Sequence, residues 1–304
     1  MSLEDFQNFY KNIYHDRWEN LNKSLLTPEI QMARWNSWAG DLETFREQSQ
    51  KYNLDFQQKH FLGGILLSSE KVVPQKTKQD VLDFYMMDPA SVYAARSLEV
   101  KDGHRVLDMC AAPGGKSLIL IESLKTSGEI ICNDLSADRR ERLKKVIQQY
   151  VPRDIRDRVW VKGQDGVQYG LREPESFDAI LLDAPCSGER HVLEDPRALA
   201  DWTPRRPRGL EQRQYSLLSA AFLALKPQGY LLYSTCSINP DENDGVVDRL
   251  LEKRGMHIEL ADLDDSILEG AEKTKSGLLY LPDRCGFGPL YVSRLFKRNS
   301  FKLK

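Results

Sequence analysis

Two cysteines and an aspartate, in two short motifs, are the residues of this sequence best suited to covalent chemistry. Asp183 opens the motif Asp-Ala-Pro-Cys that ends at Cys186, and Cys236 ends the run Tyr-Ser-Thr-Cys. Both motifs follow apolar runs typical of buried strands. A thiolate is a good nucleophile, so two thiols and a carboxylate at one sheet edge favour covalent catalysis. The alternative, cysteine as a small buried hydrophobe, fits Cys110 and Cys132 better than these two.

Other chemistries have less support. None of the five histidines falls at a matching strand end, so no base of the protease type is indicated. The five cysteines include no Cys-x-x-Cys pair, which argues against a zinc site and a disulfide framework. We therefore expect no metal.

The segment 106–116 is a second candidate site. An apolar strand runs into the turn Gly114-Gly115, which opens a helix. Backbone N–H groups there reach the edge of a parallel sheet, where ligands bind in open α/β folds. The next strand ends at Asp134, about 20 residues on, where a carboxylate can hold ribose hydroxyls. The pattern predicts a site for an adenosine-containing cofactor, with a bare turn as the alternative.

Alternating strands and helices must position these residues. Strands are expected at 105–110, 129–134, 159–164, 178–183 and 229–235, and helices at 116–125, 136–150, 211–226 and 241–254. This alternation predicts βαβ units and a parallel sheet. The carboxyl ends of its strands share one edge. That edge should bring together Cys110, Asp134, Asp165, Asp183 and Cys236.

The two ends of the chain follow other patterns. Residues 278–282 and 291–296 are strand-like and predict an antiparallel addition at the sheet edge. Aromatic residues spaced by three and four predict a helix over 4–21 whose aromatic face packs. A second helix is expected to begin at Thr27-Pro28, and a third to run from about 80 to 98 with a break at Asp88-Pro89. We expect a small, mainly helical N-terminal region (1–78) and a catalytic domain (79–304).

Composition narrows the class further. The chain has 304 residues, 41% of them hydrophobic, which is enough for an α/β domain with a small appendage. Free cysteines suit a reducing compartment. No apolar run approaches the ~20 residues of a membrane-spanning helix, and the acidic N-terminus shows no signal or transit peptide. We expect a cytoplasmic protein without membrane contact, with a mature mitochondrial protein as the open alternative.

Three motifs in this order resemble the Sun-domain family of RNA cytosine-5 methyltransferases: residues 108–116, 183–188 and 234–237. The resemblance covers residues 80–298, and segments 133–152 and 287–291 are most similar to the ribosomal-RNA branch that includes the mitochondrial enzyme. It implies an α/β fold: a Rossmann-like S-adenosylmethionine-dependent methyltransferase sheet with helices on both faces. It also implies RNA, specifically ribosomal RNA, as the substrate.

The resemblance implies a role for each motif residue. Cys236 is the implied nucleophile, which attacks C6 of a flipped-out cytosine, and Cys186 is the thiol that helps release the product. Asp183 is implied to bind the cytosine edge, and Lys116 to support base or cofactor positioning. The residues implied to bind S-adenosylmethionine are Cys110, Ala111, Ala112, Pro113, Gly114, Gly115, Lys116, Asp134, Arg139, Asp165 and Asp183.

The resemblance implies that different residues of this set hold different parts of the cofactor. The backbone of 110–116 is implied to hold the methionine part, Asp134 the ribose and Asp165 the adenine. Arg139 either braces the ribose side or is a surface helix residue. Cys236 must ionise from an ordinary thiol pKa of ~8.5. Lys116 and the start of a helix at Pro240 are the candidates for lowering that pKa.

The substrate leaves alternatives open. A base must be unpaired or flipped out to reach such a site, and we expect an irregular segment at 190–213 to close over the RNA. The net charge of −2 suits phosphate contacts poorly. Either basic clusters converge on one face, or a protein partner or pre-ribosomal particle supplies part of the RNA contact. The alternatives are a DNA cytosine-5 methyltransferase that uses Cys186, a non-catalytic ribosome-assembly factor of the same fold, and a small-molecule methyltransferase.

Overall fold

Five parallel strands form the centre of a large mixed sheet in the computed structural model, which describes residues 3–27, 30–54, 60–67, 72–264 and 269–301. These strands are β5 (Arg105–Asp108), β6 (Glu129–Asn133), β7 (Val159–Lys162), β8 (Phe177–Asp183) and β9 (Leu225–Thr235). They lie in the order β9-β8-β5-β6-β7. The chain therefore moves outward from β5 to β7 and then crosses back to β8. This reversal places a topological switch point between β5 and β8, where ligands bind in such sheets.

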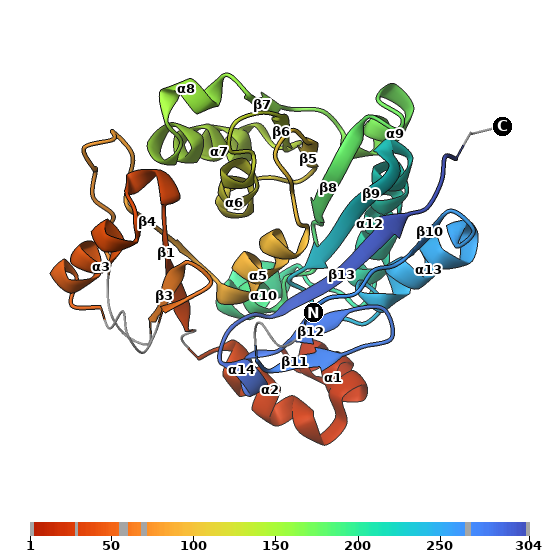
Figure 1. Ribbon diagram of the computed structural model, residues 1–304. Helices are drawn as coiled ribbons and strands as arrows, with labels where there is room; N and C mark the ends of the chain where they lie inside the picture. The colour runs from red at the N-terminus through yellow and green to blue at the C-terminus, as the bar shows by residue number, and fades with distance from the viewer. Residues whose placement is uncertain (1–2, 28–29, 55–59, 68–71, 265–268, 302–304) are drawn as a thin grey trace.

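Both faces of the sheet are apolar and covered by helices (Figure 1). Successive strand residues point to opposite faces, so Val106 and Leu107 belong to different cores. One core includes α5 (Pro89–Ser97), α6 (Gly115–Ser123) and α7 (Ala137–Tyr150). The other includes α9 (Tyr169–Arg172), α12 (Arg206–Ala224) and α13 (Asp244–Arg254). The expected doubly covered sheet is confirmed.

An antiparallel edge completes the sheet beside β9. Strand β13 (Leu290–Lys297) pairs antiparallel with β9, which confirms the expected C-terminal addition. On its other side β13 pairs with β12 and β10. The remaining strands of this edge are β10 (Ile258–Leu260), β11 (Ala271–Lys273) and β12 (Leu278–Tyr280). Short helices in the connections are α8 (Arg153–Arg156), η3 (Gly166–Gln168), α10 (Glu189–Glu194), α11 (Pro196–Ala200) and α14 (Pro282–Cys285).

The first helices of the chain pack against the C-terminal half of the molecule. They are α1 (Leu3–Tyr14), the turn η1 (His15–Arg17) and α2 (Trp18–Leu25). Phe6 and Tyr10 are completely buried in a cluster that also contains Trp202 and Ile238. The aromatic face therefore packs, as its spacing predicts.

A small sheet that the sequence analysis did not predict follows these helices. It has the order β2-β3-β1-β4. Its elements are β1 (Gln31–Trp35), η2 (Ser37–Ala39), α3 (Leu42–Lys51), β2 (His60–Phe61), β3 (Gly64–Leu67) and β4 (Phe84–Met87). Two expected helices are therefore wrong. Strand β1 lies where a helix was expected to begin at Thr27-Pro28, of which Pro28 lies outside the described residues. Strand β4 lies in the first half of the helix expected from residue 80. Each short apolar segment is stabilised by pairing with the other, a non-local contact that overrides local pattern.

Two further expectations about local structure are wrong. The segment 190–213, expected to be irregular, forms α10, α11 and the start of α12, and Trp202 within it is only 1% exposed. Helix α13 begins at Asp244 rather than at Pro240, because residues 240–243 form a turn. No helix N-terminus at Pro240 therefore faces Cys236. Among the described residues, no helix is long and apolar enough to cross a membrane.

Candidate active site

The four residues expected to be catalytic line a single cavity of about 550 Å³ at the carboxyl ends of β8 and β9. Asp183 ends β8, Cys186 follows it, Cys236 follows β9, and Lys116 reaches in from the first turn of α6. Arginines of α7, α10 and α12 line the same cavity: Arg139, Arg190 and Arg206. The cavity thus combines two thiols, the carboxylate–ammonium pair of Asp183 and Lys116, and a wall that holds three arginines together with the carboxylates of Asp88 and Glu194.

The two cysteine side chains are in direct contact. Their Sγ atoms are 3.0 Å apart. Cys236 is exposed, whereas Cys186 is partly buried. The hydrogen bond to Cys236 and burial raise the pKa of the Cys186 thiol well above its ordinary value. Cys186 therefore stays protonated, and Cys236 is the sulfur that an incoming group reaches first.

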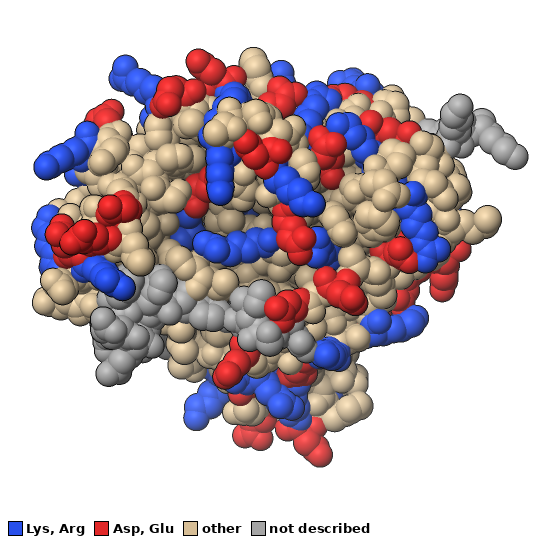
Figure 2. Space-filling view, viewed as in Figure 1, with Lys and Arg blue, Asp and Glu red and all other residues tan. Residues whose placement is uncertain are grey.

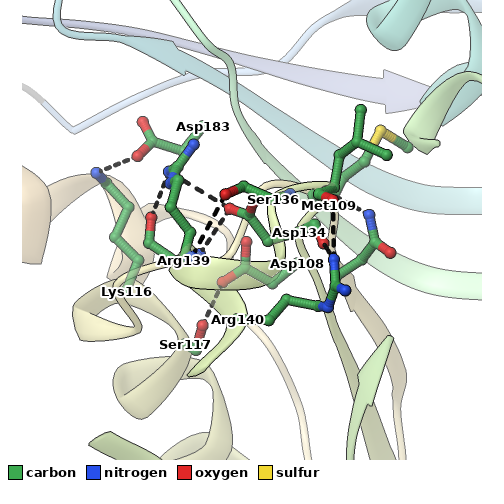
Figure 3. Close-up of polar contacts among 12 residues, drawn as sticks. Asp108, Met109, Lys116, Ser117, Asp134, Ser136, Arg139, Arg140 and Asp183 are labelled. Carbon is green, nitrogen blue, oxygen red and sulfur yellow. Dashed lines mark hydrogen bonds and ion pairs between the residues drawn. The ribbon is translucent and has the colours of Figure 1, made fainter. Parts of the chain in front are cut away.

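Lys116 and Asp183 form an ion pair across the switch point (Figure 3). Lys116 Nζ donates to Asp183 Oδ2 at 2.8 Å, and Ser234 Oγ donates to Asp183 Oδ1 at 2.8 Å. Burial lowers the pKa of Lys116, but the Asp183 carboxylate outweighs this effect, so the pKa is raised overall. The lysine keeps its proton and can act as a cationic hydrogen-bond donor inside the cavity.

A second cavity of about 220 Å³ adjoins the first and shares Lys116 and Asp183 with it. Residues 110–116 line it, together with Tyr85 of β4. Gly114 has a φ of 120°, which L side chains rarely adopt. A Cβ on Gly115 would lie 2.7 Å from the Tyr85 ring. Glycine is therefore needed for both the turn and the close approach of Tyr85, so the turn forms part of a built cavity.

The buried side chain of Asp108 makes this second cavity suitable for an amino-acid ligand. Asp108 is 1% exposed and lines the cavity. Its Oδ2 accepts a hydrogen bond from Ser117 Oγ at 2.6 Å, whereas its Oδ1 is buried without a hydrogen-bond partner (Figure 3). An unpartnered buried carboxylate oxygen matches a ligand ammonium group, such as that of the methionine part of S-adenosylmethionine. The residues present therefore fit the expected cofactor at this end.

The two acids expected to hold ribose and adenine are already engaged by the protein. Asp134 accepts from Ser136 N at 3.0 Å and from Ala112 N at 3.3 Å. Arg139 Nη2 lies 3.4 Å from Asp134 and donates to the Ala112 carbonyl at 2.6 Å (Figure 3). Arg139 thus ties α7 to the glycine turn. The ribose contact of Asp134 stays a prediction.

Asp165, expected at the adenine, lies outside both cavities. It forms an ion pair with Arg213 at 2.5 Å, and the hydrogen bond from Arg213 lowers the pKa of Asp165. The side chains of this pair are more than a third exposed. The adenine contact of Asp165 likewise stays a prediction.

Sequence reasoning missed two residues that shape the site. Asp88 lines the cavity around the two cysteines, which we name the catalytic cavity for the role expected of its residues. Its carboxylate accepts a hydrogen bond from Ala90 N, which caps α5, and another from Gly288 N at 2.7 Å. The sequence analysis used it only as a helix break, although an Asp-Pro step is itself a capping signal. Tyr85 was placed in a helix. No local pattern reveals that its ring covers Gly115.

The described residues contain no group of three or more His, Cys, Asp or Glu side chains arranged to hold a metal ion.

Comparison with known proteins gives a family match over most of this chain. The family described as 16S rRNA methyltransferase RsmB/F matches residues 95–296. The chain is 34% identical over 230 residues to the 5-cytosine rRNA methyltransferase NSUN4 of Bos taurus. This match covers 71% of this chain and 60% of that protein. It is 36% identical over 222 residues to the ribosomal RNA small subunit methyltransferase F of Serratia proteamaculans, covering 71% of this chain and 45% of that protein. The match thus spans about half to three fifths of these two relatives.

Solved structures agree on the fold. NSun6 from Pyrococcus horikoshii with SFG has a TM-score of 0.78 at 20% identity and covers 96% of this chain and 97% of its own. A methyltransferase homolog protein from Pyrococcus horikoshii has a TM-score of 0.78 at 24% identity, covering 96% of this chain and 94% of its own. The fold is that of S-adenosylmethionine-dependent methyltransferases, as the motifs predict. The chain belongs to the 16S rRNA methyltransferase RsmB/F family.

Proposed function

We propose that this protein is an S-adenosylmethionine-dependent RNA cytosine-C5 methyltransferase that acts on ribosomal RNA. The observation that carries the proposal is the pair of adjoining cavities. One holds two thiols 3.0 Å apart beside an ion pair, and the other is lined by the glycine turn. Both share Lys116 and Asp183, so a base in one would meet a cofactor in the other. The printed names of the two relatives support ribosomal RNA as the substrate class.

Covalent activation explains why a thiol is needed. C5 of cytosine is a poor nucleophile. Attack of the Cys236 thiolate on C6 forms an S–C6 bond and moves electron density to C5. Lys116, held protonated beside Asp183, supplies a donor at the base edge, and a proton at N3 makes C6 more electrophilic.

Methyl transfer and release complete the cycle. S-adenosylmethionine, when bound, supplies the methyl group that becomes attached to C5. Solvent water then takes up the C5 proton and the S–C6 bond breaks, which restores the C5–C6 double bond and the Cys236 thiolate. Cys186 touches Cys236, so we assign it to this release step.

Access for RNA depends on local rather than global charge. Figure 2 shows Lys and Arg interspersed with Asp and Glu on the face that it presents, without a continuous field of one sign. The catalytic cavity is lined by the cations Lys116, Arg139, Arg190 and Arg206 and by the carboxylates Asp88, Asp183 and Glu194. Lys116 and Arg139 are engaged by Asp183 and Asp134. We propose that Arg190 and Arg206 contact the phosphates beside an unpaired target base. A protein partner or pre-ribosomal particle supplies the remaining RNA contact.

The N-terminal region supports this catalytic unit. We propose that residues 79–304 form the catalytic domain and that residues 1–78 hold it from outside. The packing of α1 against Trp202 and Ile238 supports this division of roles.

Covalent trapping tests the proposal. Wild type, Cys186→Ala, Cys236→Ala and the control Cys285→Ala, whose thiol lies outside both cavities, are incubated with S-adenosylmethionine and ribosomal RNA. We expect 5-methylcytosine from wild type and the control, a protein–RNA adduct on a denaturing gel with Cys186→Ala, and neither product nor adduct with Cys236→Ala. An adduct that survives Cys236→Ala and vanishes with Cys186→Ala would reverse the roles and support the DNA-type mechanism. Absence of product and adduct with every RNA would support a non-catalytic factor or a small-molecule enzyme.

A further inference from the structure

Two glutamates lie completely buried directly behind the two cysteines. Glu189 belongs to α10, and Glu242 to the turn before α13; both are 0% exposed. Their hydrogen-bond partners are hydroxyl, amide and backbone N–H groups rather than Lys or Arg. Buried carboxylates are costly unless they are satisfied, and neither lines the catalytic cavity. Their role is therefore not explained by contact with a substrate.

The two glutamates hold the two cysteine segments (186–189 and 236–242) to each other. Glu242 Oε2, from the Cys236 segment, accepts from Ser187 N at 2.9 Å. Glu189 Oε2, from the Cys186 segment, accepts from Ile238 N at 3.1 Å. Each carboxyl group thus binds the backbone of the opposite segment. We call this reciprocal arrangement the glutamate clasp.

Two serine hydroxyl groups fill the space between the carboxyl groups. Ser187 Oγ lies 3.0 Å from Ser237 Oγ, and both hydroxyls contact Oε1 of both glutamates. When both acids are ionised, the two serine hydroxyls have only two hydrogens to donate among these five contacts, four to the carboxyl groups and one between the hydroxyls. Burial and the Glu189 charge raise the pKa of Glu242 to about 7. A proton on Glu242 supplies one of the missing hydrogens.

Two helices from elsewhere in the chain brace the clasp. Tyr10 OH of α1 donates to Glu189 Oε1 at 2.5 Å. Gln214 of α12 donates to Glu242 Oε2 at 2.8 Å and to the Pro185 carbonyl at 2.9 Å. The clasp is therefore held by a helix on each side. Because Cys186 precedes Ser187 and Cys236 precedes Ser237, the position of the clasp sets the positions of the two cysteines.

We propose that Glu189 and Glu242 are positioning residues that keep the Cys186 and Cys236 thiols in contact for the release step. The inference rests on the proposed function, because release is the step assigned to that contact. Loss of the clasp lets the segments separate. Attack by the exposed Cys236 then continues, whereas departure of the methylated base slows, so the covalent adduct accumulates.

The first test compares Glu242→Ala, Glu242→Gln and the control Glu252→Ala, an exposed glutamate of α13. We expect Glu242→Ala to lower kcat about a hundredfold, the usual cost of a misplaced reacting group, with little change in KM for RNA and with visible adduct. Glu242→Gln keeps an acceptor for Ser187 N and should stay within about threefold of wild type. Loss of activity in Glu242→Ala without adduct, or an equal loss in the Gln variant, would overturn the positioning role.

A second measurement needs no RNA. Phenylarsine oxide bridges two adjacent thiols through arsenic with loss of one water, and intact-protein mass reports the product. We expect fast capture by wild type and Glu242→Gln, dependent on both Cys186 and Cys236, and capture about tenfold slower in Glu242→Ala, as for a lost proximity effect. Tyr10→Phe, which removes one hydrogen bond to Glu189, should give an intermediate rate. Unchanged capture in Glu242→Ala would overturn the inference, whereas clasp-dependent capture without methylation of any RNA would overturn only the proposed function.

Discussion

The two sides of the ligand crevice differ in what their polar groups already contact. On the β8–β9 side, Lys116, Asp183 and the two cysteines face one another in one cavity. On the β6–β7 side, Asp134 and Asp165 are held by arginines of the same chain. The groups that we propose to be catalytic are therefore pre-organised, which lowers the cost of reaching a reactive geometry. If Asp134 and Asp165 bind the cofactor as proposed, they exchange a protein partner for a ligand.

Removing the nucleophile should have the largest effect. Cys236→Ala deletes the only atom that bonds to C6 in the proposed mechanism, so single-turnover methylation should fall about a thousandfold or more, as for other covalent nucleophiles. Cys285→Ala is the matched control. A Cys236→Ala enzyme that retains substantial activity would break the comparison, because the pre-organised side would then not carry the chemistry.

Removing the cation of the ion pair should have the next largest effect. Lys116→Met keeps the side-chain length but removes the donor to Asp183 and to the base. We expect kcat to fall about a hundredfold or more, the usual range for a lost acid–base group, while the exposed control Lys125→Met stays unchanged. Burst kinetics distinguish slow attack from slow release. A normal rate in Lys116→Met would mean that the ion pair is structural.

The arginine-held acids should show smaller and graded effects. Asp134→Asn should weaken S-adenosylmethionine binding about tenfold, which corresponds to ~1.4 kcal/mol. Arg139→Ala should weaken it less, because Arg139 supports Asp134 and Ala112 rather than the ligand. Arg213→Ala should change it least, since the exposed pair with Asp165 contributes ~1 kcal/mol or less. Calorimetric titration gives the dissociation constants, and tighter binding in Arg139→Ala would instead show that this arginine competes with the ribose.

Protonation of two buried acids should make the stability depend on pH. Burial raises the pKa of Glu242 and of Asp108 to about 7, from ordinary values of 4.5 and 3.8. The folded protein therefore binds these protons more tightly than the unfolded chain does, so their contribution is full below the ordinary values and is lost as the pH rises to about 7. Urea unfolding should show a free energy of unfolding that falls over this range, less steeply in Glu242→Gln. If the free energy of unfolding falls with pH as steeply in Glu242→Gln as in wild type, the proton that is bound on folding is not on Glu242.

The sequence identified the pre-organised side well, for a physical reason. The parallel strands are apolar on both faces, and their carboxyl ends must share an edge, so placing Asp183 and the two cysteines there needed only local pattern and topology. The strand order and the similarity to solved structures confirm the fold that this topology predicts. The sequence analysis did not predict the contact between the two thiols, which depends on β8 and β9 being neighbours.

The failures concern structure that depends on distant partners. Strand β4 forms because β1 lies beside it, and the glutamate clasp forms because segments 186–189 and 236–242 meet in space. The segment 190–213 was expected to be irregular, yet it is helical, and Pro196 and Pro207 lie in the first turns of α11 and α12, where proline is tolerated. Proline position, rather than proline content, carried the information.

Peptide mapping of the trapped complex tests the central claim most directly. The Cys186→Ala protein is reacted with S-adenosylmethionine and ribosomal RNA, digested with protease and nuclease, and analysed by mass spectrometry. We expect a methylated cytidine nucleotide attached to the peptide that contains Cys236. A nucleotide on a different cysteine, or an attached base without the methyl group under turnover conditions, would contradict the assignment of Cys236 as nucleophile and Cys186 as release thiol.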